Sequence, residues 1–298
     1  MFPLTPPLRP DFNAWGVRCK APLDGGLAIL SIGRPDRETD VSAHNGKAGN
    51  GNGRSQATPA DFKVIYDGFQ APVSRFDCGR KCAPLNGGEP VCCSTQNAVP
   101  LVMKAEFELL KTRSELWHKF KPYDATTRKI VRELHHSCAA IECKGVAHCE
   151  RDNRSMACRA FPFYPYITRE GEFAGLAYYW SFEETCWVIS NLSVVDKAFV
   201  DEFVRVHEYL MKVDTDELEN FTAFSANMRR VFSRRRRSIP VIGRDGKFYK
   251  VLPKSGRLVA TDPRKFPKHG PYKSEKSYRQ AVREAAHGTV EFTAELSL

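Results

Sequence analysis

Ten cysteines are the residues of this 298-residue sequence whose type and spacing most clearly indicate chemistry. Nine of them lie between Cys78 and Cys186, and only Cys19 stands apart. Cysteines that serve singly as small buried hydrophobes are not expected to cluster in this way. In a reducing compartment, clustered thiols are more often metal ligands than partners in disulfides. The pattern therefore predicts that the chain binds a transition metal or an iron–sulfur cluster.

The clustered cysteines form two groups. The first group lies within FDCGRKCAPLNGGEPVCCS and comprises Cys78, Cys82, Cys92 and Cys93. The second group comprises Cys138, Cys143, Cys149 and Cys158, and Cys186 follows later. Both groups are flanked by polar residues, which indicates that they lie on loops. Thiolates are soft ligands, so four of them select zinc or an iron–sulfur cluster over magnesium, calcium or manganese.

Cationic side chains near the cysteines should support such a site, because eight thiolates leave a considerable negative charge even with two divalent ions bound. The candidates by sequence are Arg80, Lys81, Arg154 and Arg159. Histidines are the other candidate ligands, and His135, His136 and His148 lie beside cysteines. A solvated or structural histidine is commoner, however, and the cysteines already suffice.

The segment from Cys149 to Pro162, CERDNRSMACRAFP, resembles a motif of the YkgJ-like cysteine-cluster proteins. In that motif a cysteine is followed by eight residues and then by Cys-Arg-x-Phe-Pro. The other hallmark of the family, two spaced cysteines followed by a vicinal pair, resembles the first cysteine group. The resemblance spans about residues 74 to 190. The sequence departs from the family in the longer gap between Cys82 and the pair, and in Ser155, where the family often has proline.

The family is described as zinc- or iron-chelating, and the wider group includes flagellin lysine N-methylases. The resemblance implies zinc or iron as the cofactor, with an iron–sulfur cluster as one form of the iron, and Arg154 and Arg159 as cations that support the site. It implies eight ligands, namely Cys78, Cys82, Cys92, Cys93, Cys149, Cys158, Cys186 and either Cys143 or Cys138. Cys143 is favoured because it is closer to Cys149 in the sequence. Cys138 would then be a spare thiol or a substitute ligand.

The elements that position these residues suggest an α+β fold. We expect an irregular cysteine-rich metal-binding core with packed helices, followed by a small basic C-terminal unit made of a β-hairpin and a helix. Residues 1–60 should be a flexible leader, because their Pro-rich and then Gly/Asn/Ser-rich composition buries too little apolar surface to offset ordering entropy. Only 26–32 in this leader could form a strand. Residues 61–237 form the predicted cysteine-cluster domain, and 238–298 the basic tail unit.

Apolar spacing predicts the individual helices and strands. Helices are expected over 102–120, 126–137, 195–213 and 216–237, and a strand over 173–182. Asp245-Gly246 lies between two apolar runs, which predicts a β-hairpin, and RLVAT could add a third strand. A last helix is expected from its cap at Ser274 to about His287, closed by Gly288.

The formal net charge of +10 is concentrated in one segment, since residues 229–279 hold 17 Lys or Arg and three Asp or Glu. The run from Arg234 to Arg237 suits a solvated helix C-terminus, which favours cations. The alternative is that the basic segment binds nucleic acid or another polyanion, although none of the known nucleic-acid motifs appears.

Three further features of the sequence limit the functions that it could have. The methylase relatives imply a protein-modifying enzyme as another alternative, but the sequence has no Gly-rich nucleotide loop after a clear strand and no convincing acid–base pair, so enzymatic activity stays open. No apolar run approaches the roughly 20 residues that cross a bilayer. The first residues have neither the basic start nor the apolar centre of a secretory signal. We therefore expect a cytoplasmic protein without a membrane partner.

Overall fold

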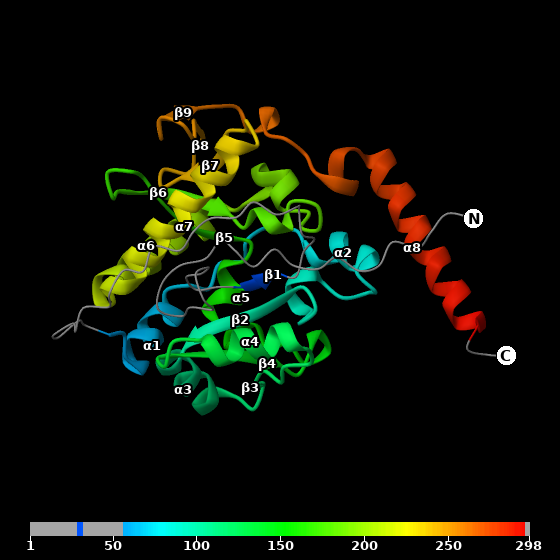
Figure 1. Ribbon diagram of the computed structural model, residues 1–298, viewed down its shortest axis with the longest axis horizontal. Coiled ribbons are helices and arrows are strands. Elements are labelled where there is room, and N and C mark those ends of the chain that lie inside the picture. Colours follow the sequence, from blue (N-terminus) through cyan, green and yellow to red (C-terminus); the bar gives the residue numbers. More distant parts are fainter. Residues whose placement is uncertain (1–28, 32–55, 296–298) are drawn as a thin grey trace.

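The computed structural model describes residues 29–31 and 56–295. Their helices and strands form the mixed α+β fold that the sequence predicts, with two antiparallel sheets (Figure 1). Most of the expected leader, including Cys19, lies outside the described residues. No helix among the described residues is both long enough and apolar enough to cross a membrane.

The helices and strands have the following bounds. The α-helices of the described chain are α1 (Pro59–Asp67), α2 (Gly79–Cys82), α3 (Lys104–Arg113), α4 (Ala125–Glu133), α5 (Met156–Ala160), α6 (Lys197–Val213), α7 (Thr215–Arg234) and α8 (Glu275–Glu295). The strands are β1 (Ile29–Ser31), β2 (Ala98–Met103), β3 (Trp117–Lys119), β4 (Cys138–Cys143), β5 (Phe163–Ile167), β6 (Phe173–Tyr178), β7 (Ile239–Gly243), β8 (Phe248–Val251) and β9 (Leu258–Ala260).

The first sheet has the strand order β1-β2-β4-β3, and all neighbouring strands are antiparallel. The strand expected within 26–32 is present as β1. β2 is buried along its whole length. Its Val102 packs into the main core, whereas Leu101 packs into a smaller cluster with Phe120 and with Val131 of α4. Because successive side chains of a strand point to opposite faces, α4 covers one face of this sheet and the main core covers the other.

The helix predicted over 102–120 is wrong at both ends. Residues 102 and 103 belong to β2, only Lys104–Arg113 is helical, and Trp117–Lys119 forms β3. Both strands pair with β4, which comes later in the chain. Strand formation here depends on a partner distant in sequence, and a local apolar pattern does not reveal that partner. The other predicted helices correspond to α4, α6 and α7, although α4 ends at Glu133 and α7 at Arg234.

The second sheet is an antiparallel meander in the order β5-β6-β7-β8-β9. The strand predicted over 173–182 is present as β6 but ends at Tyr178, and Trp180–Phe182 forms a 3-10 helix instead. α7 packs against β5, with Phe224 edge-on to Tyr164. Gly175 of β6 has a φ of 147°, and a side chain there would collide with the carbonyl of Ile242 in β7. Glycine therefore allows the close pairing of β6 with β7.

The C-terminal hairpin around Asp245-Gly246 is confirmed by β7 and β8, and β9 is the third strand. These strands do not form a sheet of their own, since β7 also pairs with β6. The expected boundary between residues 237 and 238 falls in the connection between α7 and β7, and the second sheet takes strands from both sides of it.

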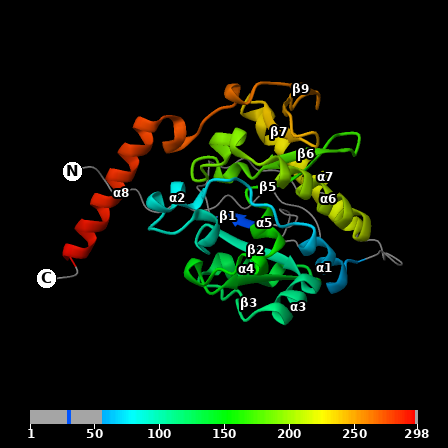
Figure 2. The same ribbon diagram turned by 180° about the vertical axis from the view of Figure 1, so that it is seen from behind.

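The last helix, α8, stands at the edge of the molecule beside α2 (Figures 1 and 2). Ser274 caps it as predicted, because its hydroxyl accepts the N–H of Ser277. The helix does not stop at Gly288 but continues to Glu295. A glycine within a helix costs about 1 kcal/mol and does not by itself end it.

Candidate metal centre

Eight cysteines of the described chain are free thiols, and they come from four segments. The segment around α2 carries Cys78, Cys82, Cys92 and Cys93, the end of β4 and the turn after it carry Cys143 and Cys149, α5 carries Cys158, and the turn after residues 180–182 carries Cys186. The expectation that the cysteines lie on loops is therefore wrong for Cys82 in α2, for Cys138 and Cys143 in β4, and for Cys158 in α5. We call these eight residues the thiol cluster.

The first segment brings its thiols together through a short helix and a reversed loop. Cys78 precedes α2 and Cys82 ends it, so the two are about one helical turn apart. Gly87 and Gly88 have φ values of 62° and 87°, which reverse the chain after α2. The Sγ atoms of Cys92 and Cys93 then lie 4.0 Å apart. Two sulfurs on one tetrahedral zinc ion, at about 2.3 Å each, would be about 3.8 Å apart.

Charge interactions connect this segment to Cys186. The neighbouring thiols of Cys78 and Cys82 add to burial in raising the pKa of Cys186. Cys82 is in turn close enough to Cys93 for a charge on one to disfavour a charge on the other. Cys186 lies more than ninety positions after Cys93, the last cysteine of the first group. The fold therefore brings a distant cysteine to the first group.

Cys158 connects the two cysteine groups. Charges on Cys93 of the first group and on Cys143 of the second both act on its thiol, and a charge on Cys149 acts on Cys143. Burial is the main reason that the pKa of Cys158 rises to about 12, and the thiols of Cys93 and Cys143 add to the rise. All eight thiols thus belong to one electrostatically connected cluster.

Most thiols of the cluster are protonated at neutral pH in the absence of a bound cation. Burial, followed by the charges of Cys82 and Asp77, raises the pKa of Cys78 to about 11. Cys93 differs, because a hydrogen bond from Cys92 and the charge of Arg154 lower its pKa to about 7. Cys93 is therefore the thiol most ready to act as an anionic ligand, and a cation bound by the others would displace protons.

Arg154 is the cation in direct contact with a thiol, since its Nε donates to Cys149 Sγ at 3.2 Å. Burial lowers the pKa of Arg154, but the hydrogen bond and the charges of Cys149, Cys158 and Cys92 raise it more. Arg154 therefore stays charged and favours thiolates around it. The supporting role that the resemblance implies for Arg154 stays a prediction.

Arg159 contacts the backbone rather than a thiol. Its guanidinium donates to the carbonyls of Arg154 (3.0 Å), Asp152 (2.6 Å) and Phe69, and it lies 4.7 Å from the ring centroid of Tyr66. It therefore fixes the loop that presents Arg154. Of the other candidate cations, Arg80 forms an ion pair with Asp77 at 3.4 Å. Lys81 lies over the ring of Tyr278.

Two residues that the sequence did not single out hold the same loop from α3 and β3. Arg113 donates to the Asn153 side chain and to the Asp152 carbonyl, both at 3.0 Å. The indole of Trp117 donates to the Asn153 carbonyl at 2.6 Å. Neither residue belongs to a recognisable motif, so only the fold reveals this role.

The remaining candidates are Cys138 and three histidines. Cys138 is buried at the start of β4 and its sulfur is disulfide-bonded, so it is neither a spare thiol nor available as a thiolate. His135 shares a 2.7 Å hydrogen bond with Ser137 and stacks on His136. His148 is exposed in the turn before Cys149.

The position of Cys158 depends on how α5 is anchored. Ser155 caps α5, because its hydroxyl accepts the Cys158 N–H at 3.3 Å. Its φ of −61° is the value that a proline ring imposes, so serine can replace the proline common in the similar family.

Glu106 of α3 accepts from the Met156 N–H and from the Tyr66 hydroxyl, both at 2.7 Å. Glu106 was also missed from sequence, because nothing local marks it as buried.

Replacing Glu106 by glutamine is expected to change the pH dependence of stability. Burial raises its pKa from the ordinary 4.5 to about 7, so the folded protein keeps a proton that the unfolded chain releases above pH 4.5. The contribution of Glu106 is fully present below pH 4.5 and is lost as the pH rises towards 7, by up to about 1.4 kcal/mol per pH unit. Urea unfolding across this range measures the free energy of unfolding.

The glutamine variant should lack this loss, whereas Glu108→Gln, which alters an exposed carboxylate on the same helix, should keep it. Identical pH profiles for the Glu106 variant and the natural protein would contradict the role given to Glu106.

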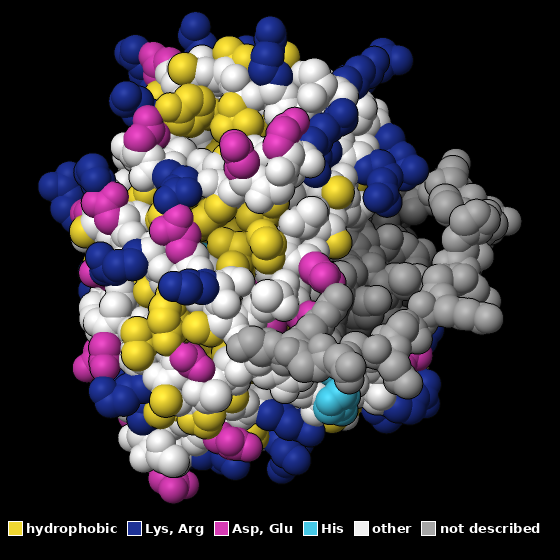
Figure 3. Space-filling view, turned by 90° about the vertical axis from the view of Figure 1, so that its left-hand side faces the viewer, with side chains coloured by type: hydrophobic (Ala, Val, Ile, Leu, Met, Phe, Trp, Pro, Cys, Tyr) yellow, Lys and Arg dark blue, Asp and Glu magenta, His cyan; other side chains and the backbone are white. Residues whose placement is uncertain are grey.

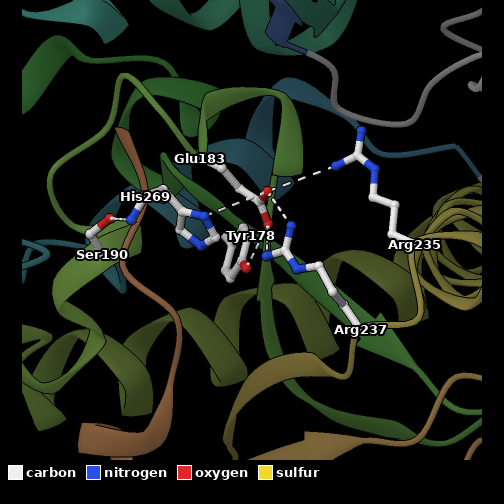
Figure 4. A network of polar contacts seen from close by, with 6 residues as sticks. All are labelled: Tyr178, Glu183, Ser190, Arg235, Arg237 and His269. Atoms are coloured by element: carbon white, nitrogen blue, oxygen red, sulfur yellow. Dashed lines mark hydrogen bonds and ion pairs between the residues drawn. The ribbon is translucent and has the colours of Figure 1, made fainter. Parts of the chain in front are cut away.

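The basic run at the end of α7 is partly used inside the molecule. Figure 4 shows Arg235 and Arg237 pointing toward Glu183, whose side chain is 8% exposed. Arg237 donates to both carboxylate oxygens at 2.8 Å, and Arg235 lies 3.8 Å away. On the face drawn in Figure 3, the described Lys and Arg side chains are interspersed with Asp and Glu rather than gathered in one patch.

The thiols of the cluster are near one another without forming a finished coordination shell. Across residues 29–31 and 56–295, no three His, Cys, Asp or Glu side chains are arranged so that they could hold a metal ion. The donor chemistry nevertheless fits a soft metal, because the donors are thiols, one pair has nearly the required separation, and Arg154 offsets negative charge.

Comparisons of the chain with protein-family models, with curated proteins and with solved structures find no match.

Proposed function

We propose that this protein binds zinc or iron, the latter as ions or as an iron–sulfur cluster, through the thiol cluster. The ligands are Cys78, Cys82, Cys92, Cys93, Cys143, Cys149, Cys158 and Cys186. The observation that carries the proposal is that eight free thiols from four segments are linked by charge interactions, with the Arg154 guanidinium donating to Cys149 Sγ. The raised pKa values mean that the thiolate form is unfavourable at these buried positions. A bound metal cation displaces the protons and neutralises the negative charge of the thiolates.

Metal binding in this proposal requires the thiols to move closer together. Cys92 and Cys93 are already near the separation that one ion requires. The loop that precedes them contains Gly87 and Gly88, whose backbones tolerate large changes in φ and ψ. The vicinal pair and the surplus of thiolates slightly favour an iron-containing site, while zinc satisfies the same ligands.

The deciding experiment is metal analysis together with the absorption spectrum of full-length protein purified anaerobically without chelators. We expect about one or more zinc or iron atoms per chain. A brown sample with charge-transfer absorption identifies an iron–sulfur cluster, and a colourless sample that contains metal identifies zinc. Protein that contains neither metal would refute the proposal.

A pair of variants tests the choice between the two cysteines of β4. Cys143→Ser should lower the metal content, because Cys143 is a free thiol near Cys93 and Cys149. Cys138→Ser, at the other end of the same strand, breaks the disulfide of Cys138 but removes none of the eight free thiols, so it should lower stability and keep the full metal content. The reverse result would assign the ligand to Cys138 and remove Cys143 from the set.

The alternatives from sequence draw less support from the described residues. Binding of nucleic acid would need free arginines at the end of α7, and two of them contact Glu183. A lysine N-methylase activity rests on the resemblance alone. Salt-dependent binding of RNA or DNA, and transfer of a methyl group from S-adenosylmethionine, are the measurements that would favour one of these alternatives.

A further inference from the structure

Residues 269–278, which lead into α8, pack against the turn that carries Cys186. The Tyr272 hydroxyl donates to the carbonyl of Thr185, the residue before Cys186, at 3.1 Å. The two backbones come closest at Gly270, where a side chain would lie 2.8 Å from the carbonyl oxygen two residues before Cys186. Gly270 also has a φ of 49°, a conformation that favours glycine. The turn before Cys186 is therefore in tight contact with this segment.

The same segment reaches the first cysteine group at the start of α8. The ammonium of Lys81, the residue before Cys82, lies over the Tyr278 ring at 5.6 Å from its centroid. α8 also contacts residues 83–85, which follow Cys82, and Figures 1 and 2 both show α8 beside α2. The rings of Tyr272 and Tyr278 are stacked, with centroids 6.0 Å apart. One aromatic pair therefore joins the contacts on the two sides.

Burial of the thiols follows these contacts. Cys82 and Cys186 are 7% and 6% exposed, whereas the six other thiols of the cluster are only partly buried. Tyr272 is buried in the same core. Burial is the main cause of the raised pKa of Tyr272, and charges on Cys82 and Cys186 add to it. The two cysteines beside the contacts of the segment are therefore the most buried thiols of the cluster.

The segment is held in place by few contacts. Tyr272 is the one buried side chain of residues 269–278, and the others are exposed or half-buried. The backbone N–H of His269 donates to Ser190 Oγ at 2.9 Å, and its ring lies 3.8 Å from Glu183. A segment with little buried apolar surface opens at a lower free energy than the core on which it packs. It can therefore lift while both sheets stay folded.

We propose that residues 269–278 are a movable cover on the Cys82 and Cys186 side of the thiol cluster, and that Tyr272 is the positioning residue that holds the cover closed. Lifting of the cover exposes these two thiols to a metal ion, or to a chelating molecule that removes the ion. The role in metal exchange rests on the proposed function. The shielding of the two thiols does not, and it is measured without metal.

The first test is the rate at which N-ethylmaleimide alkylates each cysteine of the full-length, metal-free protein, followed by peptide mass spectrometry. Cys82 and Cys186 should react more slowly than the half-buried Cys149. Tyr272→Ala should raise the rates at these two positions about tenfold or more, because loss of a buried ring favours the open form. Tyr272→Phe keeps the ring and loses one hydrogen bond, so it should raise them about fivefold or less. Tyr123→Ala removes an exposed tyrosine elsewhere and should change neither rate.

A second variant keeps the test valid if Tyr272→Ala does not fold. Gly270→Ala places a methyl group against the backbone before Cys186, so it pushes the segment away from the turn without altering a tyrosine. It should raise the same two rates. Equal rates for Cys82, Cys186 and Cys149 in the natural protein would overturn the proposal. Unchanged rates in the folded variants, or equal acceleration of all eight thiols, would also overturn it.

The second test is the rate at which the protein, as purified, loses its metal to a chelator. Tyr272→Ala should start with the same metal content and lose it about tenfold faster than the natural protein, because the cover opens more often. An unchanged rate of loss would overturn the role of the cover in metal exchange. Protein that holds no metal would instead refute the proposed function, and the alkylation rates would still decide whether the cover exists.

Discussion

Replacing Cys158 by serine is expected to lower the metal content and the thermal stability of the protein together. Cys158 lies in α5 between the two cysteine groups, near Cys93 and Cys143. A serine hydroxyl is a hard, weakly acidic donor and does not replace a thiolate for zinc or iron. Structural zinc sites contribute about 10–16 kcal/mol of apparent binding energy, so the loss of a central ligand should cost several kcal/mol.

Metal analysis and thermal unfolding of the same anaerobic sample measure both effects. The control is the natural protein after its metal has been removed with a chelator. The metal-free protein and the Cys158 variant should melt at nearly the same temperature, because the substitution acts through the metal. Full metal occupancy and an unchanged melting curve in the variant would show that Cys158 is not a ligand.

The cysteines could be named as candidate ligands because their spacing and the flanking Cys-Arg-x-Phe-Pro run are local properties of the sequence, and their role as ligands stays a prediction. The α6–α7 pair and the Asp245-Gly246 hairpin were predictable for the same reason, since apolar period and turn residues are also local. The end of α3 and the start of β3 could not be predicted from the sequence, because β3 forms only when it pairs with β4.

The parts of the site that sequence could not reveal are contacts to backbone and buried carboxylates. Arg159 was expected to support thiolates, but its donors are taken by three carbonyl groups. Glu106 and Glu217 look like ordinary surface residues of helices, and tertiary packing buries both. Burial is the main cause of the raised pKa of Glu217, and the charges of Asp214, Asp216 and Glu106 add to it, so Glu217 and the anchor of α5 are electrostatic neighbours.

The ion pair between Glu183 and Arg237 gives the second large prediction. Glu183 accepts from Arg237 at both oxygens and from the Tyr178 hydroxyl at 3.0 Å (Figure 4). His269, from the segment leading to α8, lies 3.8 Å from the same carboxylate. Glu183, in the turn before Cys186, therefore contacts both Arg237 after α7 and His269 before α8. Arg237→Met should destabilise the protein by about 3 kcal/mol, because it leaves a buried carboxylate without its main partner.

A double-mutant cycle separates loss of the pair from loss of packing. Glu183→Gln in the Arg237→Met background should recover most of the stability, since the uncompensated charge is then gone. Arg236→Met is the matched control, because Arg236 is the exposed neighbour in the same run, and it should change the free energy of unfolding by less than about 0.5 kcal/mol. Urea unfolding of the four proteins of the cycle gives the coupling energy.

Additive effects below about 1 kcal/mol for each single variant would mean that solvent screens the pair, as it does on an open surface. A coupling of several kcal/mol would instead mean that a polyanion could bind Arg237 only by breaking a strong internal contact.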